Sequence, residues 1–166
     1  MIKVCLVIGL CLFWWLMCYI NTGGDEKNLR GLRSYPKEVQ EMMRNDKTLG
    51  EKAPAEANIP KVFTENLILF TVLFLIIGLV LKYTIGFKGF LDIFIYFLIM
   101  GESLNLFDLV VIDLLWWRNT KRIRFSFIPD KSLYQNPSMH IGSFVRGLVM
   151  YVIVALIVAG VLTLLP

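Results

Sequence analysis

Charged residues are scarce in this chain of 166 residues: only 18% are Asp, Glu, Lys or Arg, against roughly 25% in an ordinary soluble domain. Hydrophobic residues make up 57% of the chain, and they are gathered in long blocks with few or no charges. A soluble domain instead alternates short apolar runs with polar ones. The composition therefore argues against a water-soluble domain and indicates an integral membrane protein.

Cysteine and histidine are also sparse, and the motifs of the common catalytic sites are missing. The three cysteines, Cys5, Cys11 and Cys18, all lie in the first apolar block, which argues against a disulfide framework and a zinc site. His140 is the only histidine, and the chain contains no HExxH, CxxC, P-loop or GxGxxG motif. We therefore predict no metal site and no cofactor, and we favour a protein that is not an enzyme.

Four apolar blocks are long enough to cross a bilayer as helices. They cover residues 4–20, 62–83, 90–117 and 141–165. The shortest block would span about 26 Å as a helix, close to the thickness of a hydrocarbon core. Only Lys3 precedes this block and no small-residue cleavage site follows it, so we expect an uncleaved anchor. The sequence predicts an all-α protein with a single membrane domain over residues 1–166, folded as a transmembrane four-helix bundle.

The two large polar connections, residues 21–61 and 118–140, contain thirteen of the seventeen Lys and Arg residues. Because Lys and Arg concentrate in cytoplasmic loops, we expect both connections to lie in the cytoplasm. Both termini would then lie outside a bacterial plasma membrane. Within the first connection, residues 35–44 have the pattern of a short amphipathic helix, with Val39, Met42 and Met43 on one apolar stripe.

The third block, residues 90–117, is unusual for a membrane span because it carries several polar side chains. These are Asp92, Glu102, Asn105, Asp108 and Asp113. An ionisable group inside a membrane costs about 2.5–3.5 kcal/mol by insertion scales, so these groups must be sheltered from lipid. At about 100° per residue they cover more than half of the helix circumference. We therefore predict that this helix is the polar centre of the bundle, with Glu102, Asn105, Asp108 and Asp113 as a membrane-buried cluster.

Two roles are open for these acids. In a structural role, Asp113 would pair with Arg146, and Asp92 would pair with Lys88 at i, i+4. In a functional role, the carboxylates would carry protons or bind cations in a polar cavity. Residues 101–103 are also a candidate for a break in the helix at mid-membrane, as in transporters with discontinuous helices.

A basic cluster directly follows Trp116 and Trp117. Its members are Arg118, Lys121, Arg122 and Arg124. Aromatic residues followed by basic ones are typical of a membrane interface, so we expect this cluster to contact lipid head groups. Basic residues that flank apolar blocks do not indicate nucleic-acid binding. The expected partners are membrane lipids and either another membrane protein or a second copy of this chain.

Three functional hypotheses follow, and the first is the leading one. It is a non-enzymatic accessory or interaction subunit of the membrane. The second is a small oligomeric transporter or ion-conducting unit that uses Glu102 and Asp108. The third is an enzyme that modifies lipid head groups at the cytoplasmic interface, with Asp113, Asn119 and His140 beside the basic cluster.

Three segments also carry a resemblance to a known family. They are residues 34–40 (SYPKEVQ), 107–121 (FDLVVIDLLWWRNTK) and 127–129 (FIP). The chain resembles a family of small, uncharacterised four-span membrane proteins from Gram-positive bacteria, which are often labelled transporter permeases. The resemblance covers most of the chain and implies a topology rather than an activity. Members often carry His where Asn119 stands, so this chain departs from the pattern there, and a metal or acid–base role for that position is less expected.

Overall fold

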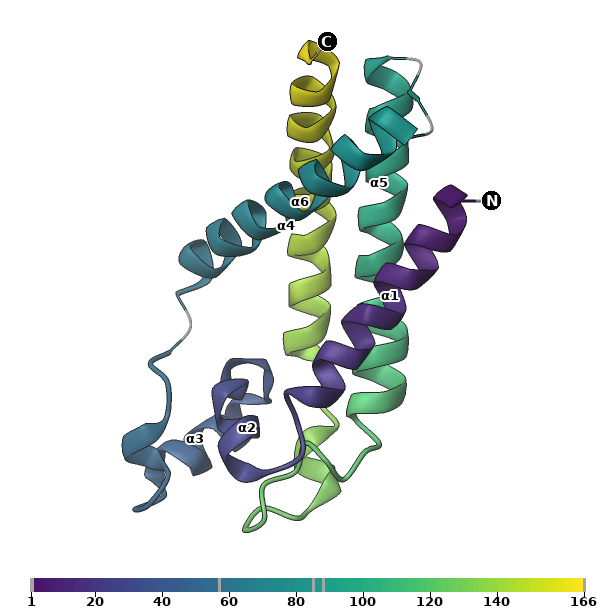
Figure 1. Cartoon of the computed structure of the whole chain (residues 1–166). Helices are drawn as coiled ribbons and strands as arrows, with labels where there is room; N and C mark the ends of the chain where they lie inside the picture. The colour runs from purple at the N-terminus through teal and green to yellow at the C-terminus, as the bar shows by residue number, and fades with distance from the viewer. Residues whose placement is uncertain (1, 57, 85, 88, 166) are drawn as a thin grey trace. The chain divides into compact units, whose positions relative to one another are not determined.

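The computed structural model describes residues 2–56, 58–84, 86–87 and 89–165, and every regular element within these ranges is helical. The main helices are α1 (Ile2–Ile20), α2 (Asp25–Arg30), α3 (Lys37–Asn45), α4 (Ile59–Thr84), α5 (Phe90–Phe107), η3 (Asp108–Trp117) and α6 (Ser138–Leu164) (Figure 1). Three short 3-10 turns, η1 (Leu32–Ser34), η2 (Gly50–Lys52) and η4 (Lys131–Tyr134), lie between them. The predicted all-α fold is confirmed for these ranges.

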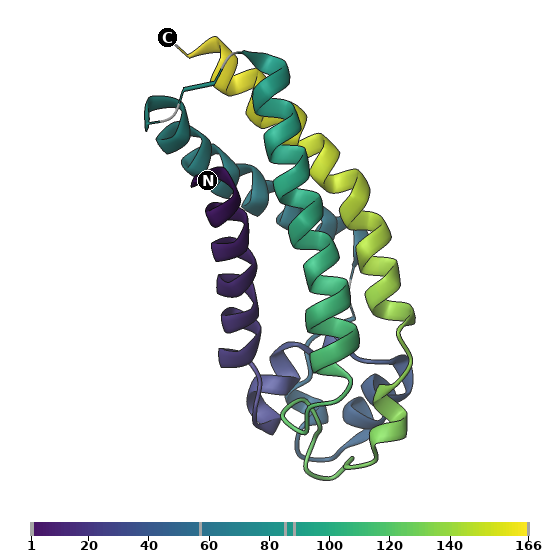
Figure 2. The ribbon, with the colours of Figure 1, turned by 90° about the vertical axis from the view of Figure 1, so that its right-hand side faces the viewer.

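Within the described ranges, four helical stretches are long and apolar enough to cross a membrane. They are Ile2–Ile20, Ile59–Thr84, Phe90–Trp117 and Lys131–Leu164. Each contains or closely matches one of the four predicted spans, and the third has the predicted bounds. Figure 2 shows α5 and η3 following one another as a single helix. No helix break occurs at residues 101–103, because α5 continues to Phe107; that expectation was wrong.

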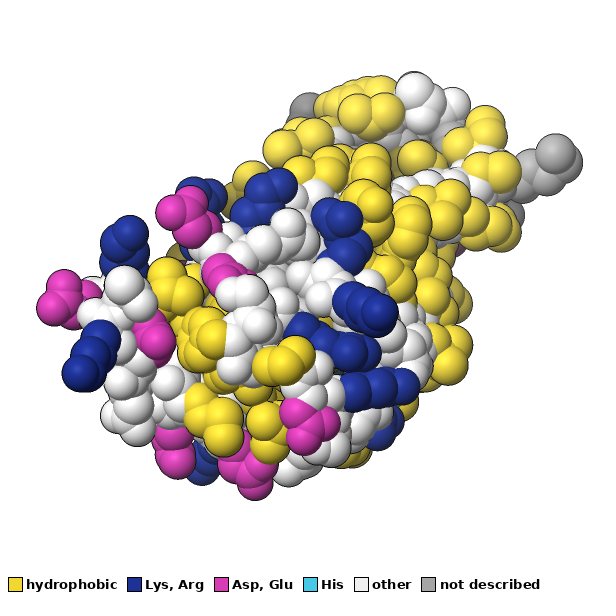
Figure 3. Space-filling model, turned by 90° about the horizontal axis from the view of Figure 1, so that it is seen from below, with side chains coloured by type: hydrophobic (Ala, Val, Ile, Leu, Met, Phe, Trp, Pro, Cys, Tyr) yellow, Lys and Arg dark blue, Asp and Glu magenta, His cyan; other side chains and the backbone are white. Residues whose placement is uncertain are grey.

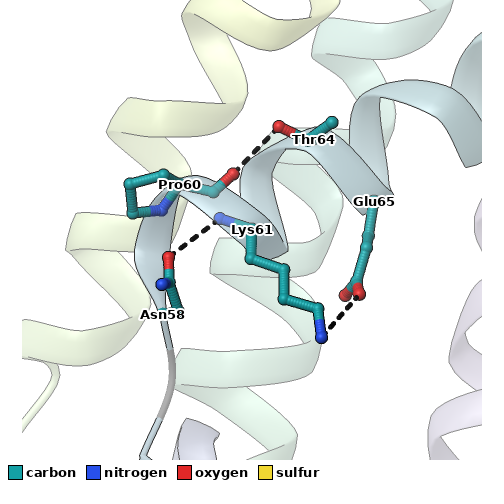
Figure 4. Close-up of polar contacts among 5 residues, drawn as sticks. All are labelled: Asn58, Pro60, Lys61, Thr64 and Glu65. Atoms are coloured by element: carbon teal, nitrogen blue, oxygen red, sulfur yellow. Dashed lines mark hydrogen bonds and ion pairs between the residues drawn. The ribbon is translucent and has the colours of Figure 1, made fainter.

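The helix α4 begins a turn before the predicted span because its first turn is well capped (Figure 4). The Asn58 side-chain oxygen accepts a hydrogen bond from the backbone N–H of Lys61 at 3.1 Å, which satisfies one of the free donors of the helix end. Pro60 suits the first turn because its missing N–H would have no partner there. The Thr64 hydroxyl donates to the Pro60 carbonyl at 3.0 Å.

By its internal contacts the chain forms two compact units. The first unit contains Met1–Ala57 and Leu106–Phe144, and the second contains Asn58–Asn105 and Val145–Pro166. The helical stretch of α5 and η3 and the helix α6 each contribute residues to both units.

In the first unit, the two polar connections fold together around a hydrophobic core. We call residues 21–56 and 118–137 the cap. Its buried core contains Leu29, Leu32, Tyr35, Val39, Met43, Ile123, Phe125, Ile128 and Tyr134, together with Trp117 from the end of η3. The predicted amphipathic helix is present as α3, and Val39 and Met43 are buried on the core. Met42, the third residue of the predicted stripe, is 45% exposed.

Tyr35 lies at the centre of this core. Its hydroxyl donates a hydrogen bond to the Ile123 carbonyl at 2.8 Å, and its ring contacts Trp117 with centroids 4.9 Å apart. Burial raises the pKa of Tyr35, which keeps the phenol neutral and able to donate. Ile123 and Phe125 are both buried in the core, and the segment that carries them consists of turns and bends.

In the second unit, α4, α5 and α6 approach each other closely at glycines. A Cβ atom at Gly101 would lie 2.5 Å from Tyr151 Cδ1, and one at Gly78 would lie 2.4 Å from Leu162 Cδ1. Ala155 and Ala159 on α6 are fully buried. Small residues let helices approach closely where no water drives association. At the end of α6 the Lys82 ammonium donates to the Leu162 carbonyl at 2.9 Å.

Candidate acid–base site

The helix changes its winding at Asp108, and this change organises the site. From Asp108 to Trp117 the backbone is a π-helix of 10 residues, and the Arg118 N–H continues its pattern by bonding to the Asp113 carbonyl, five residues earlier, at 3.3 Å. In an α-helix, residues five apart point about 140° away from each other. In a π-helix, residues five apart stand about one turn above each other. The wider winding therefore turns Asp108 and Asp113 toward the same side.

Asp113 pairs with His140, near the start of α6. The Asp113 Oδ2 lies 3.0 Å from His140 Nδ1. The pair is well sheltered, since the side chain of His140 is 6% exposed and that of Asp113 is 13% exposed. A buried carboxylate beside one ring nitrogen fixes the orientation of the imidazole and favours a proton on that nitrogen.

The other ring nitrogen of His140 is buried but has no hydrogen-bond partner among the described residues. The ring of Trp117 stands edge-on to the imidazole, with centroids 4.9 Å apart and an angle of 67°. A buried polar atom without a partner costs free energy, so it requires an explanation. An imidazole with one nitrogen on a carboxylate and the other unoccupied is suited to accept and release a proton.

Asp108 lies next to this pair. Its Oδ1 accepts a hydrogen bond from the indole N–H of Trp14 on α1 at 3.0 Å. Asp108 also interacts electrostatically with Asp113 and His140, and the Cys18 thiol on α1 interacts with both carboxylates. The first unit thus brings two acids and a histidine together from η3 and α6, and α1 supplies a donor.

The four residues of the predicted polar cluster fall into two pairs, one in each unit. In the second unit the Asn105 amide donates to Glu102 Oε2 at 3.4 Å, and a Cβ at Gly147 would lie 2.3 Å from Asn105 Oδ1. In the first unit Asp108 and Asp113 belong to the acid–base site. A pairing of Asp113 with Arg146 would join the two units and stays a prediction. The pairing of Asp92 with Lys88 rests on Lys88, which lies outside the described residues.

One member of the basic cluster has a role inside the protein. The Arg122 guanidinium donates to the carbonyls of Tyr19 and Thr22 at 3.2 and 3.0 Å and lies over the Tyr19 ring at 3.9 Å. Arg122 thereby fastens the end of α1 to the cap. Figure 3 shows a row of Lys and Arg side chains on one side of the face seen there, while on the other side Lys and Arg are mixed with Asp and Glu. Head-group contact by Arg118, Lys121 and Arg124 stays a prediction.

Asn119 does not join the site. Its amide donates to the Leu115 carbonyl at 2.8 Å, and its Oδ1 accepts from Lys131 Nζ at 2.9 Å. Of the three residues considered for a lipid-modifying enzyme, the structure brings together Asp113 and His140 only. Within the described ranges, no group of three or more His, Cys, Asp or Glu side chains is arranged to hold a metal ion.

In the sequence His140 is a candidate only under the lipid-modifying hypothesis, because a lone histidine beside an apolar block is usually solvated or caps a helix. Its partner is distant in the sequence, so spacing cannot reveal the pair. The available signal was the position of the only histidine beside a polar span. Comparison with known proteins adds no further guide, because no family model, no curated protein and no solved structure matches the chain.

Proposed function

We propose that this chain is a non-enzymatic membrane component that binds and transfers protons, with Asp108, Asp113 and His140 as its proton-binding groups. One observation carries the proposal: a buried His140 whose Nδ1 lies 3.0 Å from Asp113 and whose Nε2 is unpartnered in the described part of the chain. Chains of Asp, Glu and His inside membrane segments are the usual elements of proton relays in pumps and transporters.

The proposal includes a placement in the membrane. We infer a four-helix bundle with α1, α4, α5 with η3, and α6 as spans, in which the third span supplies the polar centre. The rings of Trp15, Tyr19 and Trp116 lie within 6.3 Å of one another, and such amphipathic rings favour the head-group region. Asp113 would then lie near the interface and Asp108 about one turn deeper, so the two acids would form consecutive steps from the membrane surface inward.

In this proposal the cap faces the cytoplasm of a bacterial plasma membrane, as the distribution of Lys and Arg predicts. Its packed core gives the interfacial end of the site a rigid support, because Trp117 contacts both Tyr35 of the cap and His140. An accessory role without proton transfer is the competing hypothesis. A lipid-modifying enzyme has less support, since the polar atoms of Asn119 are engaged elsewhere.

Proton flux in liposomes tests the proposal. The purified chain is reconstituted around a pH-sensitive dye, and a potassium diffusion potential drives proton entry. We expect faster acidification than in protein-free liposomes. We expect His140→Ala and Asp113→Asn each to lower the rate about tenfold or more, because each removes a group that handles the proton.

The matched control is Glu65→Gln. Glu65 is an exposed carboxylate on α4 in a 3.9 Å ion pair with Lys61 (Figure 4), so its loss should leave the flux unchanged. Wild-type protein that acidifies no faster than empty liposomes would refute the proposal and leave the accessory role. A His140→Ala variant with the wild-type rate would refute the assignment of the site.

A further inference from the structure

The hydrogen bond between Trp14 and Asp108 has a consequence beyond holding α1 in place. Trp14 and Asp108 are 94 residues apart in the sequence, and the donor–acceptor distance is 3.0 Å. Tryptophans in an apolar helix, such as Trp14 and Trp15, commonly anchor it at the membrane interface. The structure separates the two: the ring of Trp15 contacts Tyr19 and Trp116, whereas the indole N–H of Trp14 donates to the acid.

An indole N–H can only donate a hydrogen bond. A donor aimed at a carboxylate oxygen stabilises the ionised form of the acid more than the protonated form. Burial acts in the opposite direction, because a charge is costly where water is excluded. The indole therefore compensates for part of the cost of keeping Asp108 charged in its partly buried position.

We propose that Trp14 is a positioning residue for Asp108, and that the docking of α1 thereby sets the acidity at which the acid–base site exchanges its proton. This inference rests on the proposed proton-binding function. The titratable groups that interact with Asp108 from the elements around it are Asp113 on η3, His140 on α6 and Cys18 on α1. Trp14 differs from all of these because it does not itself gain or lose a proton.

The test compares Trp14→Phe with Trp15→Phe. Both substitutions keep an aromatic ring in α1, but only the first removes the donor to Asp108. Infrared difference spectra of the reconstituted full chain are recorded against pH, and the carboxylic-acid C=O band of Asp108 is assigned by its absence in Asp108→Asn. We expect Trp14→Phe to raise the pH at which Asp108 is half protonated by about one unit. Trp15→Phe should leave the midpoint in place.

Equal midpoints in wild type and Trp14→Phe would overturn the inference, and so would equal shifts in the two variants. The spectra do not depend on transport. If the liposomes show no flux while Trp14→Phe still shifts the midpoint, the proposed function fails and the positioning role of Trp14 stands. If flux is present and the midpoint does not move, the proposed function stands and the positioning role of Trp14 fails.

Discussion

Replacing Asp113 with alanine should lower the free energy of unfolding by about 3 kcal/mol or more, because it leaves the buried His140 without its partner. The wild-type pair lies at 3.0 Å with both side chains largely shielded from solvent. Breaking such a pair exposes the full cost of desolvating the remaining polar group. Equilibrium unfolding of the full chain in a mild detergent, followed by the fluorescence of its tryptophans, measures the change.

The double variant Asp113→Ala with His140→Phe provides the matched comparison. It removes both polar partners, so we expect it to recover part of the stability lost in Asp113→Ala. The substitution Glu65→Ala, at an exposed surface carboxylate, should change the stability by no more than about 0.5 kcal/mol. An Asp113→Ala variant as stable as wild type would show that the pair is not buried as described.

Replacing Gly101 with valine should destabilise the second unit strongly, by about 3 kcal/mol or more. A Cβ at this position would lie 2.5 Å from Cδ1, 2.7 Å from Cγ and 2.9 Å from Cβ of Tyr151. The crowded atoms are near the backbone of α6 and cannot swing away like the end of a flexible side chain. Thermal unfolding of the purified chain in detergent checks the effect.

The control for this substitution is Gly160→Val, which also introduces a β-branched residue into a long apolar helix. No atom lies within 4 Å of the Cβ position at Gly160. Valine and glycine differ little in helix propensity, so the stability should be close to that of wild type. Equal stabilities for the Gly101 and Gly160 variants would contradict the close approach of α5 and α6.

The four long apolar helices were predictable because length and hydropathy depend on local sequence alone. The third helical stretch ends at Trp117 as predicted, since Trp116, Trp117 and Arg118 mark an interface by composition. The helix α4 begins at Ile59, before the predicted start at residue 62, because the cap by Asn58 starts the helix earlier than the apolar block does.

The site was only partly predictable. Asp108 and Asp113 were identified as polar residues of a membrane span, but α-helical spacing set them on different faces. The π-helical winding from Asp108 to Trp117 brings them to one side, and no spacing rule in the sequence indicates this winding. The partnership of His140 with Asp113 and that of Trp14 with Asp108 join distant parts of the chain, so only the three-dimensional structure reveals them.

The hydrophobic core of the cap could not be predicted from the sequence either. A charge-rich connection indicates a solvated loop, yet Tyr35, Ile123, Phe125 and Tyr134 are buried in a shared core. Each of these residues is isolated among polar neighbours in the sequence. Their common core forms only when two segments separated by the long helices α4 and α5 with η3 come together.

Isotopic labelling of the histidine nitrogens tests the central claim most directly, because His140 is the only histidine and its ring gives the only signals. In membrane-reconstituted wild-type protein we predict a neutral ring with its proton on Nδ1, hydrogen-bonded to Asp113, and an Nε2 without a proton. In Asp113→Asn this preference should be lost. A neutral ring that carries its proton on Nε2, unchanged by Asp113→Asn, would contradict the acid–base site.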